Sequence, residues 1–190
     1  MTALHRAIAS CRECSAHFPH DPRPVVQFSS TSRLLIIGQA PGSKVHESGI
    51  PWQDASGQRL LEWTGLENDQ LHDPSLVALV PMGFCYPGKG NSGDLPPREE
   101  CAPLWHGKIV SALPQSRLTL LVGNYAQSHY LPEMRSLTMT DKISRWRELL
   151  PDTVLLPHPS WRSRFWINQN PWFEAEVLPE LRRLVARALA

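Results

Sequence analysis

The chain has 190 residues, of which 42% are hydrophobic and 19% are charged, and its formal net charge is +1. No apolar stretch approaches the roughly 20 residues of a membrane span, and the first residues lead into no signal-type apolar core, so we expect no membrane partner and a cytoplasmic location. A nearly neutral protein has no overall field that attracts nucleic acid, so any such binding must use a local basic patch.

This length suits one domain that spans residues 1–190. In chain order we expect a helix at 2–9, a strand at 33–39, a helix at 56–65, a strand at 76–82, a loop at 84–97, a helix at 98–113, a strand at 117–123, helices at 124–130 and 141–150, a strand at 153–156 and a helix at 172–190. Ser56 and Asn124 are the predicted N-caps of their helices, and Gly65 is a predicted helix stop. Strands that alternate with helices indicate an α/β fold, with three α/β/α layers and a central four-stranded, mostly parallel sheet.

The turn after the first predicted strand is the first candidate site. The strand contains the unbroken apolar run LLII at 34–37, which is typical of a strand buried on both faces, and it stops in the turn GQAPG at 38–42. In open α/β sheets, ligands bind outside the carboxyl ends of the strands. The polar side chains that we expect there are Gln39, Asp54 and His158.

The four cysteines form the second candidate site. Cys11 and Cys14 make a C-x-x-C pair, Cys85 follows a predicted strand, and Cys101 opens a predicted helix. Four thiolates suit either zinc or an iron–sulfur cluster, and the spacing leaves both open. A third possibility is four unrelated cysteines, some of them buried as small apolar residues.

Three segments together carry a family resemblance. Residues 38–42 (GQAPG), 49–52 (GIPW) and 158–160 (HPS) resemble the uracil-DNA glycosylase superfamily, whose first motif reads G-x-x-P-[GAY] and whose second reads H-P-S. The likeness spans most of the chain and is closest to the iron–sulfur families four and five, because the four cysteines fall where theirs do. It implies a monomeric, monofunctional DNA glycosylase that flips a deaminated base out of DNA and hydrolyses its N-glycosidic bond, with uracil as the expected base.

The resemblance also implies a [4Fe–4S] cluster. Its expected ligands are Cys11, Cys14, Cys85 and Cys101. Hydrolytic base removal needs no electron transfer, so we expect the cluster to act as a scaffold that ties polar, loop-rich segments to the sheet.

His158 is the expected leaving-group residue. It stands between two prolines, and breaking an N-glycosidic bond places negative charge on the base carbonyl oxygen, which a positioned hydrogen-bond donor stabilises. The resemblance gives the H-P-S histidine this role and makes Ser160 a phosphate contact. The alternative is a histidine that only ends a strand.

Asp54 and Gln39 are the other two expected catalytic residues. Asp54 precedes a predicted helix and resembles the D-x-S-G aspartate that serves family five; the alternative is that it only caps the helix. Family four has a glutamate where this chain has Gln39, an amide that cannot titrate but can orient water or bind the base. Family one has a catalytic aspartate where this chain has Ala40, so that mechanism does not carry over.

Recognition of the base departs from the family pattern. The base-reading asparagine of family four falls on Pro81, which has no side-chain amide and no backbone N–H. Backbone groups of Met82 or Gly83, or the side chain of Gln39, would then have to read the base. Other polar residues that can reach the site from the glycine-rich loop are Asn91, Ser92 and Asp94, although a solvated position is the commoner fate of such residues.

Trp52 matches the aromatic residue that stacks on the flipped base in the superfamily, while a core position is the alternative in a chain with seven tryptophans. The residues that we expect to contact the substrate are Gly38, Ala40, Pro41, Gly42, Trp52, Met82 and Gly83.

The segment WRSRFW at 161–166 follows the second motif and is the expected DNA contact. Arginines that alternate with aromatic residues on a loop suit phosphate contacts and a wedge that fills the stack left by an extruded base. Trp166 and Trp172 are expected in the core. The expected DNA contacts are Ser160, Trp161, Arg162 and Arg164.

Two rival interpretations remain. The missing asparagine and glutamate are compatible with a non-catalytic iron–sulfur nucleic-acid-binding protein of the same fold. A zinc-stabilised α/β enzyme acting on a free nucleoside is the second rival, although it would leave the basic aromatic segment without a purpose.

Overall fold

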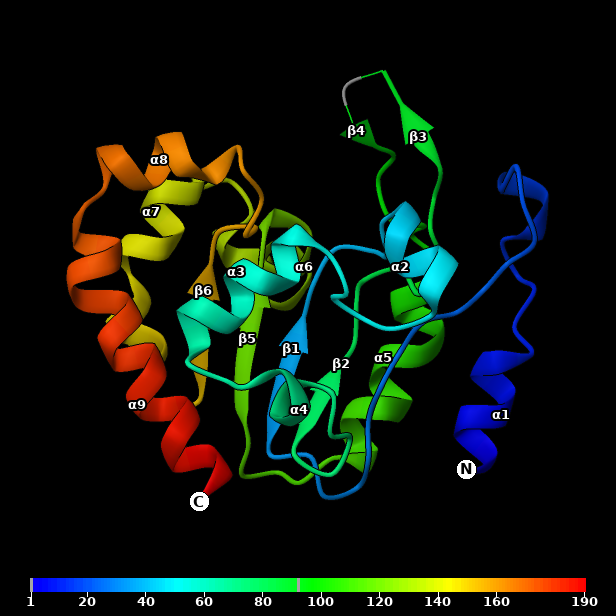
Figure 1. Cartoon of the computed structure of the whole chain (residues 1–190), viewed down its shortest axis with the longest axis horizontal. Helices are drawn as coiled ribbons and strands as arrows, with labels where there is room; N and C mark the ends of the chain where they lie inside the picture. Colours follow the sequence, from blue (N-terminus) through cyan, green and yellow to red (C-terminus); the bar gives the residue numbers. More distant parts are fainter. Residues whose placement is uncertain (1, 92) are drawn as a thin grey trace.

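The computed structural model describes residues 2–91 and 93–190 and has a four-stranded sheet at its centre (Figure 1). The strands are β1 (Leu34–Ile37), β2 (Val77–Leu79), β5 (Leu118–Val122) and β6 (Thr153–Leu156), in the order β2-β1-β5-β6. Every neighbouring pair is parallel, and Leu34 lies opposite both Val77 and Leu118. The predicted α/β fold is confirmed, and every strand pair of the central sheet is parallel.

Helices cover both faces of this sheet, which is why the four residues of β1 are all buried and show no alternation. The helices are α1 (Ala3–Ala9), α2 (Ser43–Ser48), α3 (Ala55–Thr64), α4 (Asn68–Leu71), α5 (Cys101–Ala112), α6 (Asn124–Tyr130), α7 (Met139–Ser144), α8 (Ser163–Gln169) and α9 (Leu178–Leu189). In Figure 1, α3 and α4 lie in front of the sheet and α5 and α6 behind it. Helix α9 packs on α3 and on the two central strands. Within the described residues, no helix is long and apolar enough to cross a membrane.

The strands all end at the upper edge of the sheet in Figure 1. From β1 the chain crosses to one side, to β2, and from β5 it crosses to the other side, to β6, so the strand order reverses between β1 and β5. Such a reversal opens a crevice at the carboxyl ends of the central strands. The turn after β1 and the segment after β6 both leave the sheet at this edge, as the sequence predicts for its two motifs.

Two of the predicted helix caps are wrong. Asp54, not Ser56, is the N-cap of α3, because its carboxylate Oδ1 accepts the Gly57 N–H at 2.9 Å. Gly123, not Asn124, precedes α6, because the Asn124 side chain is engaged elsewhere: its Oδ1 accepts from Nζ of the buried Lys142 at 2.7 Å. The predicted stop of α3 at Gly65 is confirmed, with a φ of 72°.

Several loop and helix predictions also need correction. The segment expected as pure loop at 84–97 carries a two-stranded antiparallel ribbon of β3 (Lys89–Gly90) and β4 (Gly93–Asp94), whereas Ser92 lies outside the described residues. The segment after the second motif is partly helical, since α8 includes Arg164. The helix expected at 141–150 is split into α7 and a 3-10 turn, and the last helix begins with a π-helical stretch before α9. Helices α2 and α4 were not predicted, because elements of six and four residues carry too little periodicity to be recognised.

Candidate functional site

A pocket opens at the carboxyl edge of the sheet, where open α/β sheets bind their ligands. It is formed mainly by the turn after β1, the turn before α3 and the end of β6. The predicted site residues that line it are Gly38, Gln39, Ala40, Pro41, Gly42, Trp52, Asp54 and His158. The fold therefore brings both sequence motifs and Asp54 to one cavity.

Trp52 is held in this pocket by an unusual backbone conformation. Its φ of 59° lies in the left-handed region, which a bulky side chain seldom adopts. Two glycines leave room for it: a Cβ atom on Gly38 would lie 2.8 Å from the Trp52 ring, and one on Gly57 would lie 1.7 Å from the Trp52 carbonyl oxygen. Strain of this kind persists where the surroundings impose it, and it is common at functional sites. The ring lines the pocket and is also partly packed on the core, so a core position does not remove it from the candidate site.

Asp54 combines a capping role with a position in the pocket. Its Oδ1 caps α3 by accepting from Gly57, while its Oδ2 lies 4.0 Å from the point where a Cβ atom on Gly42 would be. A carboxylate has two oxygens with several acceptor positions, so capping leaves capacity for a water or a sugar. The two alternatives that the sequence left open for Asp54 are thus compatible with each other.

His158 lines the same pocket as Asp54, on a loop that is held by hydrogen bonds to the His158 carbonyl. The His158 carbonyl accepts from the Ser160 N–H at 2.8 Å and also from the Ser163 hydroxyl. Its ring centroid is 6.2 Å from that of Trp52. Burial lowers the pKa of His158 below the ordinary value of 6.5, although the negative charges of Asp54 and Asp94 act in the opposite direction. Burial therefore favours the neutral imidazole, which can donate one hydrogen bond.

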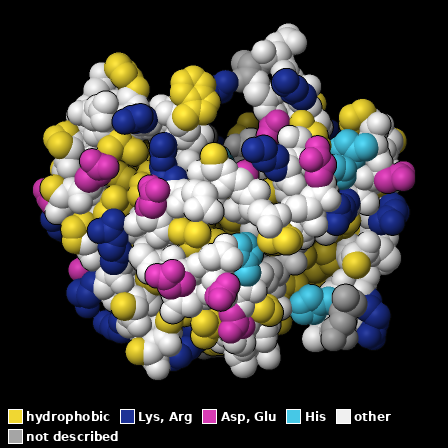
Figure 2. Space-filling view, viewed as in Figure 1, with side chains coloured by type: hydrophobic (Ala, Val, Ile, Leu, Met, Phe, Trp, Pro, Cys, Tyr) yellow, Lys and Arg dark blue, Asp and Glu magenta, His cyan; other side chains and the backbone are white. Residues whose placement is uncertain are grey.

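The segment after His158 presents exposed basic and aromatic side chains beside the pocket. Trp161 and Phe165 are 77% and 71% exposed, and the Arg162 guanidinium lies 5.6 Å from the Trp161 ring centre. Ser160 is fixed through its carbonyl, which accepts from Arg59 of α3 at 2.8 Å. In the space-filling view, basic side chains flank a notch between the ribbon β3–β4 and this segment (Figure 2). As expected, Trp166 and Trp172 pack against the core.

The end of β2 contributes a pocket wall that offers no free backbone donor. Pro81 lines the pocket, and its carbonyl accepts a hydrogen bond from Nε2 of His106 at 3.0 Å. His106 is buried, and this burial lowers its pKa to about 4. The structure places Met82 and Gly83 outside this lining. Their N–H groups donate to the carbonyls of Gly38 and Gln39 at 2.9 and 3.0 Å. These two backbone donors are thus engaged in holding the first motif against β2.

The four cysteines line a second cavity. Among residues 2–91 and 93–190, no three Cys, His, Asp or Glu side chains are close enough together to share one metal ion. All four thiols nevertheless line one common cavity, and four cysteines are a donor set that suits either zinc or an iron–sulfur cluster.

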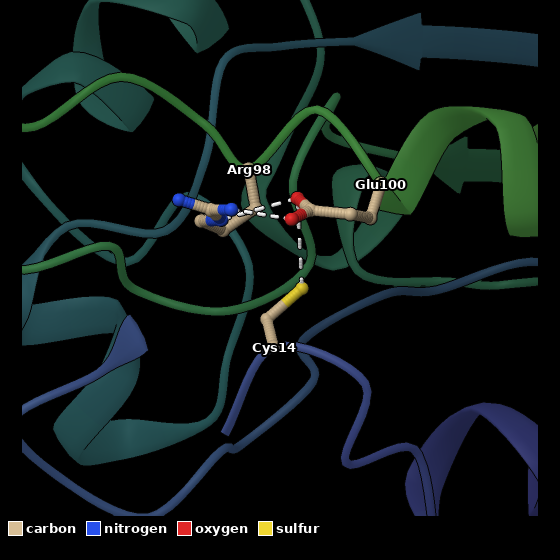
Figure 3. A network of polar contacts seen from close by, with 3 residues as sticks. All are labelled: Cys14, Arg98 and Glu100. Atoms are coloured by element: carbon tan, nitrogen blue, oxygen red, sulfur yellow. Dashed lines mark hydrogen bonds and ion pairs between the residues drawn. The ribbon is translucent and has the colours of Figure 1, made fainter. Parts of the chain in front are cut away.

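A polar network ties the N-terminal cysteine pair to the start of α5 (Figure 3). Arg98 pairs with Glu100, with 3.1 Å between Nε and Oε2, and Cys14 Sγ approaches the same carboxylate oxygen at 3.9 Å. The hydrogen bonds from Arg98 hold the pKa of Glu100 at about 2. This contact holds Cys14 near Cys101, the first residue of α5.

Two further observations fit a sulfur-ligated centre in this cavity. Burial raises the pKa of Cys85 to about 11 and that of Cys101 to about 12, so a bound cation is needed to hold them as thiolates. The indole Nε1 of Trp105, a residue that lines the cavity and is 8% exposed, has no hydrogen-bond partner in the described structure. An orphaned buried N–H is rare, and sulfur bound in the cavity would offer it an acceptor.

Comparison with known protein families matches residues 25–182 to the uracil DNA glycosylase superfamily. The chain belongs to this superfamily. The match includes both motifs, the pocket, Cys85 and Cys101, whereas Cys11 and Cys14 precede it. Superfamily membership places the protein among DNA-glycosylase-type hydrolases, which act on DNA in base excision repair.

Three residues that support the superfamily site were not singled out in the sequence. Arg59 holds the Ser160 carbonyl, Ser163 holds the His158 carbonyl, and His106 holds the Pro81 carbonyl. Each acts on a backbone group that is distant in sequence or hidden in a helix, so no local pattern could have revealed it. Their common effect is to fix the pocket walls before a ligand binds.

Proposed function

We propose that this superfamily member hydrolyses the N-glycosidic bond of a deaminated base in DNA, with uracil as the expected base. The observation that carries the proposal is the single pocket in which His158, Asp54 and Trp52 meet at the carboxyl edge of the sheet. The exposed basic and aromatic segment beside it supports DNA as the substrate in preference to a free nucleoside.

The proposed chemistry divides the charges of the transition state between two residues. As the bond between C1′ and the base nitrogen breaks, its electron pair leaves with the base and positive charge develops on the sugar. Neutral His158 donates a hydrogen bond to the base oxygen that gains negative charge. Asp54 faces the sugar with its uncapped oxygen, stabilises the cation and orients the water that attacks C1′. The water proton passes to the carboxylate or to solvent.

Gln39 is the proposed reader of the base. It lines the pocket, and its side-chain amide offers both a donor and an acceptor to a Watson–Crick edge. Pro81 lacks a backbone N–H, and the N–H groups of Met82 and Gly83 are engaged within the protein. The Trp52 face, held against Gly38, supplies the surface on which the flipped base stacks.

We also propose that the four cysteines hold a [4Fe–4S] cluster, which supplies a structural tether between the N-terminal segment, the end of β2 and α5. The shared cavity and the four free thiols support this assignment, and zinc is the rival occupant. We further propose that the protein is monomeric and cytoplasmic. It acts only as a glycosylase, without lyase chemistry.

The proposed activity can be tested with oligonucleotides. The purified, metal-loaded protein should release free base from single- or double-stranded DNA that carries uracil, with hypoxanthine and xanthine as parallel substrates. If the protein binds these oligonucleotides but releases no base from any of them, the non-catalytic rival is correct. Cleavage of free deoxyuridine in preference to DNA would favour the nucleoside rival.

DNA contact through Arg162 and Arg164 gives a separate prediction. Both residues are exposed at the segment after the second motif. Replacing both by alanine should weaken binding and flatten the log–log salt dependence by about 0.9 for each lost phosphate contact on duplex DNA. The measurement is a salt titration of affinity by fluorescence anisotropy.

The matched control removes two arginines at the opposite edge of the sheet. Arg33 and Arg187 line a groove beside the amino ends of the strands, so their replacement by alanine changes the net charge equally. Equal salt slopes for the two double variants would contradict a specific role of Arg162 and Arg164.

A further inference from the structure

The ribbon β3–β4 brings a second carboxylate, that of Asp94, close to Gly42. A Cβ atom on Gly42 would lie 3.4 Å from Oδ2 of Asp94 and 4.0 Å from Oδ2 of Asp54. Gly42 itself lines the pocket. Two carboxylate oxygens from different parts of the chain thus approach the same pocket residue.

The position of Asp94 is supported by contacts on the ribbon and at its base. Tyr86 Oη donates to Asp94 Oδ1 at 3.4 Å, which leaves Oδ2 for the side of Gly42. The ribbon closes through the pairing of Lys89 with Asp94 and the Leu95 N–H bond to the Gly88 carbonyl at 2.9 Å.

Asp94 also affects the pKa of His158 in the pocket. Asp94 acts with Asp54 to raise the pKa of His158 against the lowering effect of burial. His158 is one of the residues that line the pocket. Both carboxylates therefore act on the same histidine of the pocket.

We propose that Asp94 is a second catalytic carboxylate, which faces the sugar of the extruded nucleotide and shares with Asp54 the stabilisation of its positive charge. This inference rests on the proposed function and deepens it. Two carboxylates at the sugar compensate for a chain that has no glutamate in its first motif. Asp54 uses one oxygen as a helix cap, whereas Asp94 is on an exposed ribbon that DNA can cover.

The first test measures binding, so it does not depend on turnover. We compare duplex DNA carrying a pyrrolidine abasic site, whose ring is cationic, with DNA carrying a neutral tetrahydrofuran site. The unmodified protein should prefer the cationic ring, and Asp94→Asn should reduce that preference by about tenfold, as expected for a partly solvated charge pair. Glu47→Gln, an exposed acid on α2, is the matched charge control and should leave the preference unchanged.

Two more readouts separate a catalytic role from a structural one. Asp94→Asn should slow single-turnover base release by about 10² while the folded state is retained, and it should lower the pKa of His158 in an NMR titration. Tyr86→Phe, which removes the hydroxyl that orients Asp94, should give a smaller loss in the same direction.

The outcomes distinguish the two proposals. If Asp94→Asn keeps the full preference for the cationic ring, or if the unmodified protein has none, the role of Asp94 is refuted whatever the glycosylase activity. If the preference depends on Asp94 but no base is released from any substrate, the sugar-facing role of Asp94 stands and the proposed glycosylase activity fails.

Discussion

Replacing His158 by alanine should slow single-turnover base release by about 10²–10³, because it removes one donor that acts mainly in the transition state. DNA affinity should change far less, since the ground-state base gains little from this bond. Rapid-quench measurement of base release, together with anisotropy measurement of binding, separates the two effects. A loss of affinity that equals the loss of rate would contradict the assigned role.

The lowered pKa of His158 sharpens this prediction. A histidine that titrates below 6.5 is already neutral at pH 7, so the step that it assists should be independent of pH from neutrality upward. A neutral donor can be replaced in part by an amide, and His158→Asn should therefore retain more activity than His158→Ala. A rate that rises steadily with acidity would instead indicate a protonated, cationic histidine.

Asp54→Asn tests the role of the Asp54 negative charge while preserving the helix cap that this residue provides. The amide oxygen can still accept from Gly57, so α3 should remain intact while the negative charge is lost. Full cleavage by this variant, combined with inactivity of Gln39→Ala, would assign water positioning to the first motif.

The second large effect is expected at Cys101, a proposed cluster ligand whose partly buried sulfur accepts the Phe84 N–H at 3.3 Å. The proposed cluster would colour the purified protein brown, and Cys101→Ser should abolish this colour and sharply lower the yield of folded chain. Binding of a structural metal centre is coupled to folding by on the order of 10 kcal/mol, so loss of one ligand is costly. Visible absorption, iron and sulfide analysis, and thermal unfolding of the same preparations provide the measurement.

A tryptophan variant serves as the control for the cysteine prediction. Trp105→Phe keeps an aromatic wall in the cavity but removes the orphaned Nε1–H, so it should bind the cluster while altering its lifetime in air. Colourless wild-type protein that contains stoichiometric zinc would refute the cluster and favour the zinc rival.

Local patterns in the sequence were sufficient for the architecture. The unbroken LLII run of β1 indicated a doubly covered strand, because a strand that is buried on both faces has no solvent-facing positions for polar residues. The strand ends then placed residues 38–42 and His158 at one edge, since parallel strands all end on the same side. Both inferences depend on the spacing of apolar residues and on the order of the strands along the chain, and both can be read from one sequence without any interatomic distance.

Only the tertiary structure decided how the site is completed. Asp94 sits forty residues after Asp54 on a ribbon too short to be recognised, yet both approach Gly42. Asp54 replaced Ser56 as the cap because a carboxylate reached the Gly57 N–H, and Trp52 took its place through space left by two glycines. Such outcomes arise from contacts between segments that are distant in sequence, whose energies depend on packing, and neither propensity nor motif spacing contains that information.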